Sequence, residues 1–200
     1  QHLRADAEGH GQPSTEGEAE MSYLHACSLL AVFAGVVGAA TGHAQGKLAD
    51  VPVRTREEFS FVASGSYAEV FPLFGAHQER VWATGFDPQF IHPVPPRDEA
   101  GMVFTTIQDD LSRVWVNTAF DASTGHVQYV YWIADVMAAL IDIHITTSGG
   151  PTTSVHVVYE RTALRPEANE RVRHMAHLDA NSGPHWAAMI NWYLANAAAR

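Results

Sequence analysis

The fold of this chain is decided by residues 101–164, GMVFTTIQDDLSRVWVNTAFDASTGHVQYVYWIADVMAALIDIHITTSGGPTTSVHVVYERTAL. This stretch contains strand-like segments separated by short polar turns. The segments are Met102–Gln108, Ser112–Phe120, His126–Ile133, Val136–Thr147 and Thr153–Leu164. Asp, Gly and Pro occupy the turns, and these residues supply the backbone angles of tight hairpins. The pattern therefore predicts an antiparallel meander.

Helices are expected on both sides of this meander. After it, Pro184 suits the first turn of a long helix, because proline fits there. That helix carries an apolar stripe at helical spacing, made of Trp186, Met189, Ile190, Tyr193 and Ala197. Before the meander, a first strand is expected over Arg56–Ala63. The Ser66–Glu69 capping-box pattern then opens the first of two short helices. A second short helix is expected over Gly75–Trp82, and the proline-rich loop 85–96 should pack Phe86, Phe90 and Ile91 against the core.

The first 44 residues differ in composition from the rest. Residues 1–20 are polar and favour disorder or an upstream extension. Residues 21–44 resemble a signal peptide: Leu29–Ala40 is uncharged and apolar, and small residues precede Gln45. This apolar run is shorter than the roughly 20 residues of a membrane helix. A retained anchor and an ordinary buried helix are the alternatives. The expected mature chain is thus one domain over residues 45–200, exported to the periplasm or secreted, with no stable membrane span after cleavage.

Charge and cysteine content restrict the partners. The net charge is −10 and no Lys/Arg cluster is present, so nucleic acid is not an expected partner. The single cysteine, Cys27, lies in the expected signal peptide, so the mature domain should hold no disulfide. The sequence does not indicate an oligomeric state.

Several short strings, taken in order, resemble a known superfamily. They are FPLF (71–74), ERVW (79–82), GFDP (85–88), GMVFTT (101–106), WVNTAFD (115–121), VHVVY (155–159) and TAL (162–164). Their order is similar to the START and birch-pollen-allergen-like (SRPBCC) superfamily, in its bacterial polyketide cyclase/dehydrase-like branch. The resemblance implies an α+β helix-grip fold: a curved antiparallel sheet of about six or seven strands around a long C-terminal helix, with two short helices after the first strand. A ligand cavity would lie between sheet and helix.

Strand alternation predicts which side chains face this cavity. In three strands the expected inward sets are Ile141, Ile143 and Ile145; Val155, Val157 and Tyr159; and, because Arg113 is charged, Val114, Val116, Thr118 and Phe120. The phase of His126–Ile133 is open, with Tyr129 and Tyr131 on one face. The predicted ligand-binding residues are Thr118, Phe120, Tyr129, Tyr131, Ile141, Ile143, Val157, Tyr159, Arg161, Trp186, Met189, Ile190 and Tyr193. Of the polar groups, Tyr129, Tyr159, Asn117 and Gln128 are the best placed to meet a ligand.

Arg161 continues the inward phase of its strand, and a buried guanidinium is costly unless it is paired. Either it reaches solvent at the cavity rim, or it holds a ligand carboxylate.

Histidines offer no recognised metal motif. His174, His177, Asp179 and His185 could in principle bind zinc, but a helix break separates them, and solvent-facing histidines are the favoured interpretation. His144 and His156 should face outward as cross-strand neighbours, too few for a closed site. We therefore expect no metal, no cofactor and no assignable catalytic residue.

Three functions remain open. The leading hypothesis is an exported domain that binds a small hydrophobic or amphipathic ligand such as a lipid, a polyketide or an aromatic acid. One alternative is a cyclase or dehydratase that uses cavity Tyr and His as acid–base groups. The other is a structural or stress domain whose cavity is filled by its own side chains.

Overall fold

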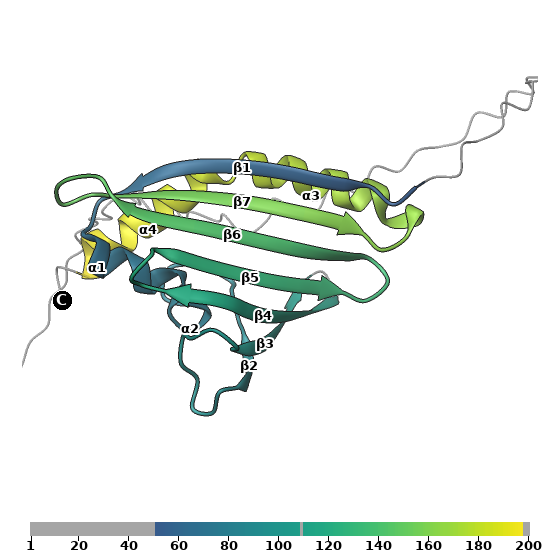
Figure 1. Ribbon diagram of the computed structural model, residues 1–200, viewed down its shortest axis with the longest axis horizontal. Helices are drawn as coiled ribbons and strands as arrows, with labels where there is room; N and C mark the ends of the chain where they lie inside the picture. The colour runs from purple at the N-terminus through teal and green to yellow at the C-terminus, as the bar shows by residue number, and fades with distance from the viewer. Residues whose placement is uncertain (1–50, 109, 198–200) are drawn as a thin grey trace, which may run out of the picture. The chain divides into compact units, whose positions relative to one another are not determined.

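Seven strands form one antiparallel sheet in the computed structural model of this protein, which describes residues 51–108 and 110–197. The strands are β1 (Arg54–Ala63), β2 (Gln89–His92), β3 (Val103–Gln108), β4 (Leu111–Asp121), β5 (His126–Ile133), β6 (Met137–Thr147) and β7 (Thr153–Ala163). Their order in the sheet is β1-β7-β6-β5-β4-β3-β2 (Figure 1). The meander β3–β7 is thus confirmed, and β1 joins its end beside β7. The expected signal peptide lies outside the described residues.

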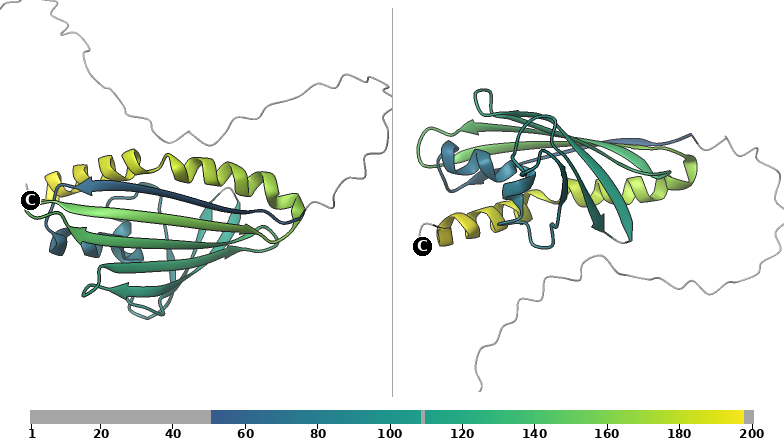
Figure 2. Two further views of the ribbon diagram at one scale, coloured as in Figure 1. Left: turned by 45° about the horizontal axis from the view of Figure 1, so that its top comes forward. Right: turned by 90° about the horizontal axis from the view of Figure 1, so that it is seen from below.

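Helices cover one face of this sheet. Between β1 and β2 come α1 (Tyr67–Val70), the 3₁₀ turn η1 (Phe71–Phe74) and α2 (Ala76–Glu79). After β7 come η2 (Pro166–Ala168), α3 (Asn169–Ala180) and α4 (Gly183–Ala197). Figure 2 shows α3 and α4 on the same side of the sheet as the short helices. The C-terminal helical region is therefore two helices, broken at Asn181 and Ser182.

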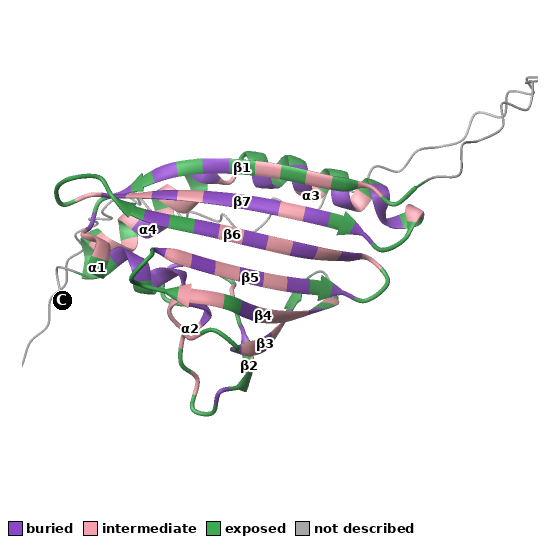
Figure 3. Cartoon of the chain, viewed as in Figure 1, coloured by how far each residue is buried: buried purple, intermediate pink, exposed green. Residues whose placement is uncertain are grey.

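Burial alternates along the central strands, as Figure 3 shows. The predicted inward residues of β6 and β7 are all buried. In β5 the inner set, which the sequence left open, is Val127, Tyr129, Tyr131 and Ile133. The core therefore lies between these strands and the helices.

The predicted phase of β4 was wrong. Arg113 is buried on the inner face, where its guanidinium donates to the backbone carbonyl of Gln108. Trp115 and Asn117 continue that inner set, while Thr118 is exposed. A bulge between Asn117 and Ala119 then returns Phe120 to the inner side, since a bulge adds one residue to one strand.

The loop before β3 was predicted only in part. Residues Gln89–His92 form the edge strand β2 instead of irregular loop. Phe86 and Phe90 pack on Phe104, with ring centroids 6.1 and 6.0 Å away. Ile91 was expected to pack inward but is 56% exposed. It is the unpaired residue of a bulge in this edge strand.

Gly125 shows how closely the hairpins pack. Its φ is +72°, and a Cβ there would lie 2.0 Å from the carbonyl oxygen of Ile145. The backbone N–H of Ile145 donates to the Gly125 carbonyl at 2.8 Å. Only glycine fits both the backbone angle and this approach.

Candidate functional site

A cavity of about 50 Å³ lies between the inner face of the sheet and the helices. The sheet lines it with Phe104, Trp115, Tyr129, Ile141, Ile143 and Tyr159. The helical side and the loop add Phe74, Glu79, Phe86 and Trp186. Most of these walls are aromatic, and Glu79 is the only ionisable carboxyl among them.

The aromatic walls are held by contacts with one another. Trp115 stacks on Phe104 at an interplanar angle of 7° and donates from its indole N–H to Thr106 at 2.9 Å. Trp186 packs edge-on against Phe59 and Trp82, with ring centroids 5.4 and 5.6 Å apart. Such ring contacts fix orientation in addition to burying apolar area. The free volume is small because these rings fill most of the space.

Glu79 gives the cavity a polar end. It is the last residue of α2, and its carboxyl group lies at the cavity wall. Loss of hydration, aided by the negative charge of Asp98, raises the pKa of Glu79 to about 8. At neutral pH this carboxyl is therefore mostly protonated. It can donate a hydrogen bond, and it can exchange a proton with a bound molecule.

Asp98 holds the short helix that carries Glu79. Its carboxylate accepts hydrogen bonds from the backbone N–H groups of His77 at 2.7 Å and Gln78 at 3.2 Å. Gly75 lets this carboxylate approach, because a Cβ at Gly75 would lie 2.1 Å from the Asp98 carboxyl carbon. Asp98 thus stabilises the first turn of α2 from a distant loop.

Two further polar groups lie near this end. The Tyr129 hydroxyl donates to the carbonyl of Phe74 at 2.9 Å. Burial first, and then the charges of Glu79 and Asp98, raise the pKa of Tyr129 well above its usual value. Asn117 is paired with Tyr129 across β4 and β5 and is fully buried. Among the described residues its amide has no hydrogen bond of normal geometry, which is uncommon in a structural core.

Arg161 fits neither of its two expected roles. It is 4% exposed, so it does not reach the rim. Its guanidinium makes a bidentate pair with Asp179 of α3, at 2.5 and 2.8 Å. The same group contacts the Tyr131 hydroxyl and lies 4.9 Å from the ring centroid of Tyr159. Because its carboxylate partner comes from the protein, a ligand acid would have to displace Asp179.

The other predicted site residues divide into three groups. Tyr129, Ile141, Ile143, Tyr159 and Trp186 all line the cavity. Tyr131, Val157 and Ile190 are buried in the surrounding core, and Phe120, Met189 and Tyr193 pack partly against it. Thr118 was wrongly placed, because it is exposed and its hydroxyl donates to the Gln128 side chain at 2.8 Å. Tyr193 lines a separate surface depression with Val81 and Trp192.

The histidines expected to face solvent lie outside this cavity. His174, His177 and His185 are exposed, while Asp179 is engaged with Arg161. Among the described residues no histidine lines the cavity. Proton transfer there would therefore depend on Glu79, Tyr129 and Tyr159.

Comparison with known proteins identifies the fold. No family model matches the chain, and no curated protein matches it in sequence. Norcoclaurine synthase from Thalictrum flavum is similar in structure, with a TM-score of 0.53 at 12% identity over 80% of this chain and 96% of that one. The structure of the same enzyme in complex with dopamine and hydroxybenzaldehyde has a TM-score of 0.53 at 13% identity, over 81% of this chain and 98% of that one. The described domain has the helix-grip fold of the START and birch-pollen-allergen-like superfamily.

The cavity described above lies where this fold grips its C-terminal helix, here α4. Within residues 51–108 and 110–197, no helix has the length and apolar character that a membrane crossing requires.

Half of the residues that line the cavity were not among the predicted ligand-binding residues. Glu79 lay in the quoted ERVW string, but nothing in a single sequence shows that its carboxyl faces inward. Trp115 was missed because the phase of β4 was assigned from the charge of Arg113, and Phe104 was missed because no inward set was assigned to β3. The aromatic character of Trp115, in phase with Arg113, was the available signal for the opposite assignment.

Proposed function

We propose that this domain binds a compact aromatic molecule, neutral or cationic, in the cavity between the sheet and α4. The observation that carries the proposal is a set of aromatic walls with a polar end formed by Glu79 and Tyr129. A cavity of this composition, with a few convergent polar groups, is the usual form of a small-molecule site. The buried amide of Asn117, which lies opposite Tyr129 and makes no hydrogen bond of normal geometry with the described residues, is a further group that a ligand could satisfy.

The volume restricts the ligand. About 50 Å³ is free, whereas a cavity of about 150 Å³ is known to accept benzene. A ring can enter only if a wall side chain moves, and the partly exposed Phe86 and Trp186 are the wall residues that we propose to move. A long-chain lipid would need a far larger rearrangement, so we favour a compact ring over a fatty acid.

Charge restricts the ligand further. Glu79 and Asp98 place acidic groups at one end of the cavity, and the Arg161 guanidinium is already paired with Asp179. The described residues that line the cavity include no Lys or Arg that could pair with an anionic ligand. An amine, in contrast, could take the proton of Glu79 and pair with the resulting carboxylate. This electrostatic arrangement favours neutral phenols and aromatic amines over the aromatic acids that the sequence left open.

Tryptophan fluorescence can test this proposal, because Trp115 and Trp186 line the cavity. We would titrate the full chain with three matched probes: 4-ethylphenol, tyramine and 3-(4-hydroxyphenyl)propionate. The dissociation constants of the phenol and the amine, obtained from the fluorescence change, should be at least tenfold lower than that of the acid. Glu79→Gln should remove the preference for the amine over the acid. Trp192 is 66% exposed outside the cavity, so Trp192→Phe should leave the titration unchanged. If none of the three probes binds, the proposal is wrong.

The small volume is the one observation that favours a filled cavity with a structural role. In that case the inner side chains would serve stability alone, and replacing Phe86 or Trp186 by alanine would create binding that the wild type lacks. Equal binding by wild type and variants would instead exclude the filled state.

Glu79 is also the observation that favours an enzyme. A carboxyl that is protonated near neutral pH can act as general acid or base, so a cyclase or dehydratase would use Glu79 and Tyr129 in place of a histidine. Glu79→Gln would then abolish turnover of a bound substrate while its binding remained.

We further propose that the domain is exported, with residues 21–44 removed as a signal peptide. The uncharged run Leu29–Ala40 and the small residues before Gln45 support this proposal. Expression in a bacterial host, followed by N-terminal sequencing of the periplasmic and secreted fractions, tests it. A new N-terminus at or near Gln45 is expected, and an uncleaved cytoplasmic product would contradict it.

A further inference from the structure

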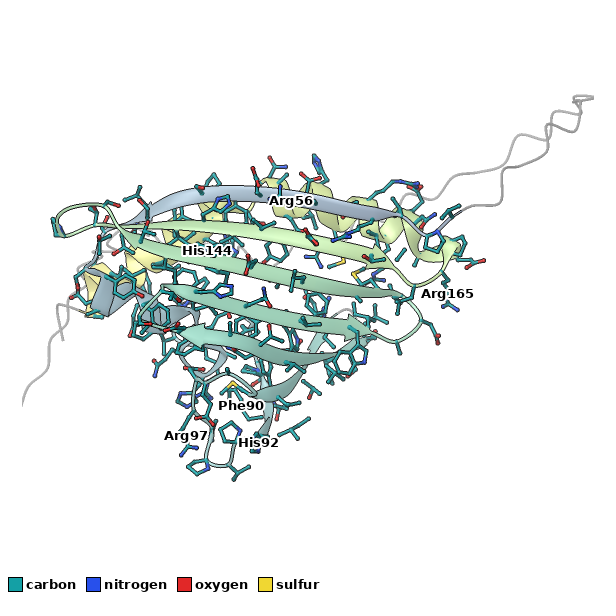
Figure 4. The ribbon with its side chains drawn as sticks, viewed as in Figure 1. Arg56, Phe90, His92, Arg97, His144 and Arg165 are labelled. Atoms are coloured by element: carbon teal, nitrogen blue, oxygen red, sulfur yellow. The ribbon has the colours of Figure 1, made fainter. Side chains whose placement is uncertain are left out.

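Two histidines and one aspartate converge on the outer face of the sheet, opposite the cavity. The register of β5 and β6 pairs His126 with His144, and Asp142 lies two residues before His144 on the same strand. The two imidazole rings stack with centroids 4.9 Å apart and an interplanar angle of 7°. His144 is labelled in Figure 4. The sequence predicted too few ligands here because it paired His144 with His156 alone and left the phase of β5 open.

The ligand atoms already point at one another. Nε2 of His126 lies 2.6 Å from Asp142 Oδ1, and Nε2 of His144 lies 3.2 Å from Asp142 Oδ2. One ligand atom from each of the three side chains lies within 4.8 Å of the others. Ligand atoms around a tetrahedral zinc ion are separated by about 3.4 Å, given bonds of about 2.0–2.2 Å. Small side-chain rotations would therefore suffice to admit an ion.

We propose that His126, Asp142 and His144 form a binding site for a zinc ion on the outer face of the sheet. Two imidazoles and one carboxylate are the ligand composition of open zinc sites, in which water or another molecule occupies the remaining position. The side chains are 30%, 27% and 51% exposed respectively. An ion can thus reach them from solvent, and the outer coordination positions stay accessible.

The surroundings hold these ligands in place. All three stand on paired strands in the interior of the sheet, where backbone hydrogen bonds fix their spacing. Gln128 lies opposite Asp142 and donates from Nε2 to Asp142 Oδ1 at 3.0 Å. A hydrogen bond of this kind orients a ligating carboxylate and supports metal affinity.

His156 offers a matched control. It is the next histidine in the same row, opposite His144 on β7, and its Nδ1 lies 2.9 Å from the Ser60 hydroxyl. It is outside the group of three whose ligand atoms converge. A site made of the three ligands therefore predicts that loss of His156 has little effect, whereas a nonspecific histidine surface predicts equal effects for all.

Calorimetric titration of the metal-free full chain with Zn²⁺ tests the site, with Co²⁺ absorption as a second readout. His144→Ala and Asp142→Asn should each weaken the binding step at least tenfold and remove the Co²⁺ visible bands, while His156→Ala should change affinity less than about threefold. The substituted side chains are partly exposed, and thermal unfolding will show that the variants fold. Zinc affinity and cobalt spectra that are the same in wild type and in both ligand variants would overturn the proposal. So would an equal loss of affinity in His156→Ala.

Discussion

Glu79→Gln should change the way in which the stability of this domain depends on pH. Desolvation raises the pKa of Glu79 from 4.5 to about 8 in the folded protein. Below about pH 4.5 the group is protonated in both the folded and the unfolded chain. Between the two pKa values the unfolded chain releases this proton and the folded protein keeps it, so the free energy of unfolding falls as pH rises. Above about pH 8 the loss is complete.

The magnitude follows from the distance between the two pKa values. Each pH unit between them is worth about 1.4 kcal/mol, so the full loss is roughly 5 kcal/mol. Glutamine keeps the shape of the side chain but cannot ionise. The variant should have the same free energy of unfolding as the wild type near pH 4.5. Its advantage should grow as pH rises between the two pKa values and reach several kcal/mol near pH 8.

Urea unfolding at constant ionic strength, measured at several pH values across this window, gives the comparison. Glu170→Gln is the control, because Glu170 lies on the exposed face of α3 with its side chain 88% exposed, and its pH dependence should follow the wild type. Parallel curves for wild type and Glu79→Gln would refute the assignment of a desolvated, protonated carboxyl to the cavity.

Three further predictions concern the core and the domain boundary. Arg161→Met and Asp179→Asn should each lower the free energy of unfolding by about 3–5 kcal/mol, because each leaves a buried charged partner unpaired. In a double-mutant cycle measured by chemical denaturation, the double variant should lose less stability than the sum of the two single losses. Strictly additive losses would contradict the ion pair. Trp186→Ala should cost about 3 kcal/mol in the same assay, less than a fully buried ring, because Trp186 is partly exposed; a cost near zero would contradict its packing on Phe59. A chain that starts at Gln45 should keep the thermal midpoint of the full chain, and a loss of more than a few degrees would show that the first 44 residues support the core.

Strand phase could be predicted where polar and apolar residues alternate strictly. In β6, Asp142 and His144 alternate with isoleucines, and in β7, Ser154 and His156 alternate with apolar residues. The inner face of each strand could therefore be predicted from this alternation. β5 offered no such contrast, because Val130 and Trp132 are as apolar as their neighbours. Only pairing with β4 and β6 decides its phase.

β4 shows why a single charge is a weak guide to phase. The long side chain of Arg113 reaches a backbone carbonyl while its stem is buried, so its charge did not mark the outer face. The bulge after Asn117 then changed the phase within the strand. Thr118 was misplaced because the phase was assigned from Arg113. The bulge, which has no clear signal in a single sequence, is the reason why Phe120 of the same predicted set still packs on the inner side.

The candidate site could be predicted only where it coincides with the core. The isoleucines of β6, Tyr159 and Trp186 were found because core periodicity and cavity lining overlap in this architecture. Glu79 depends on α2, whose place is set by Asp98 from a loop distant in sequence. The partner of Arg161 likewise comes from α3. Such tertiary partners leave no periodic trace in a sequence.

Intermolecular nuclear Overhauser effects between tyramine and the isotope-labelled protein test most directly whether the cavity binds an aromatic molecule. We expect contacts from the ligand ring to the side chains of Ile141, Trp115 and Trp186, and we expect excess 4-ethylphenol to remove them. Contacts confined to Val81 and Trp192 in the surface depression, or the absence of any contact at saturating ligand, would contradict this expectation.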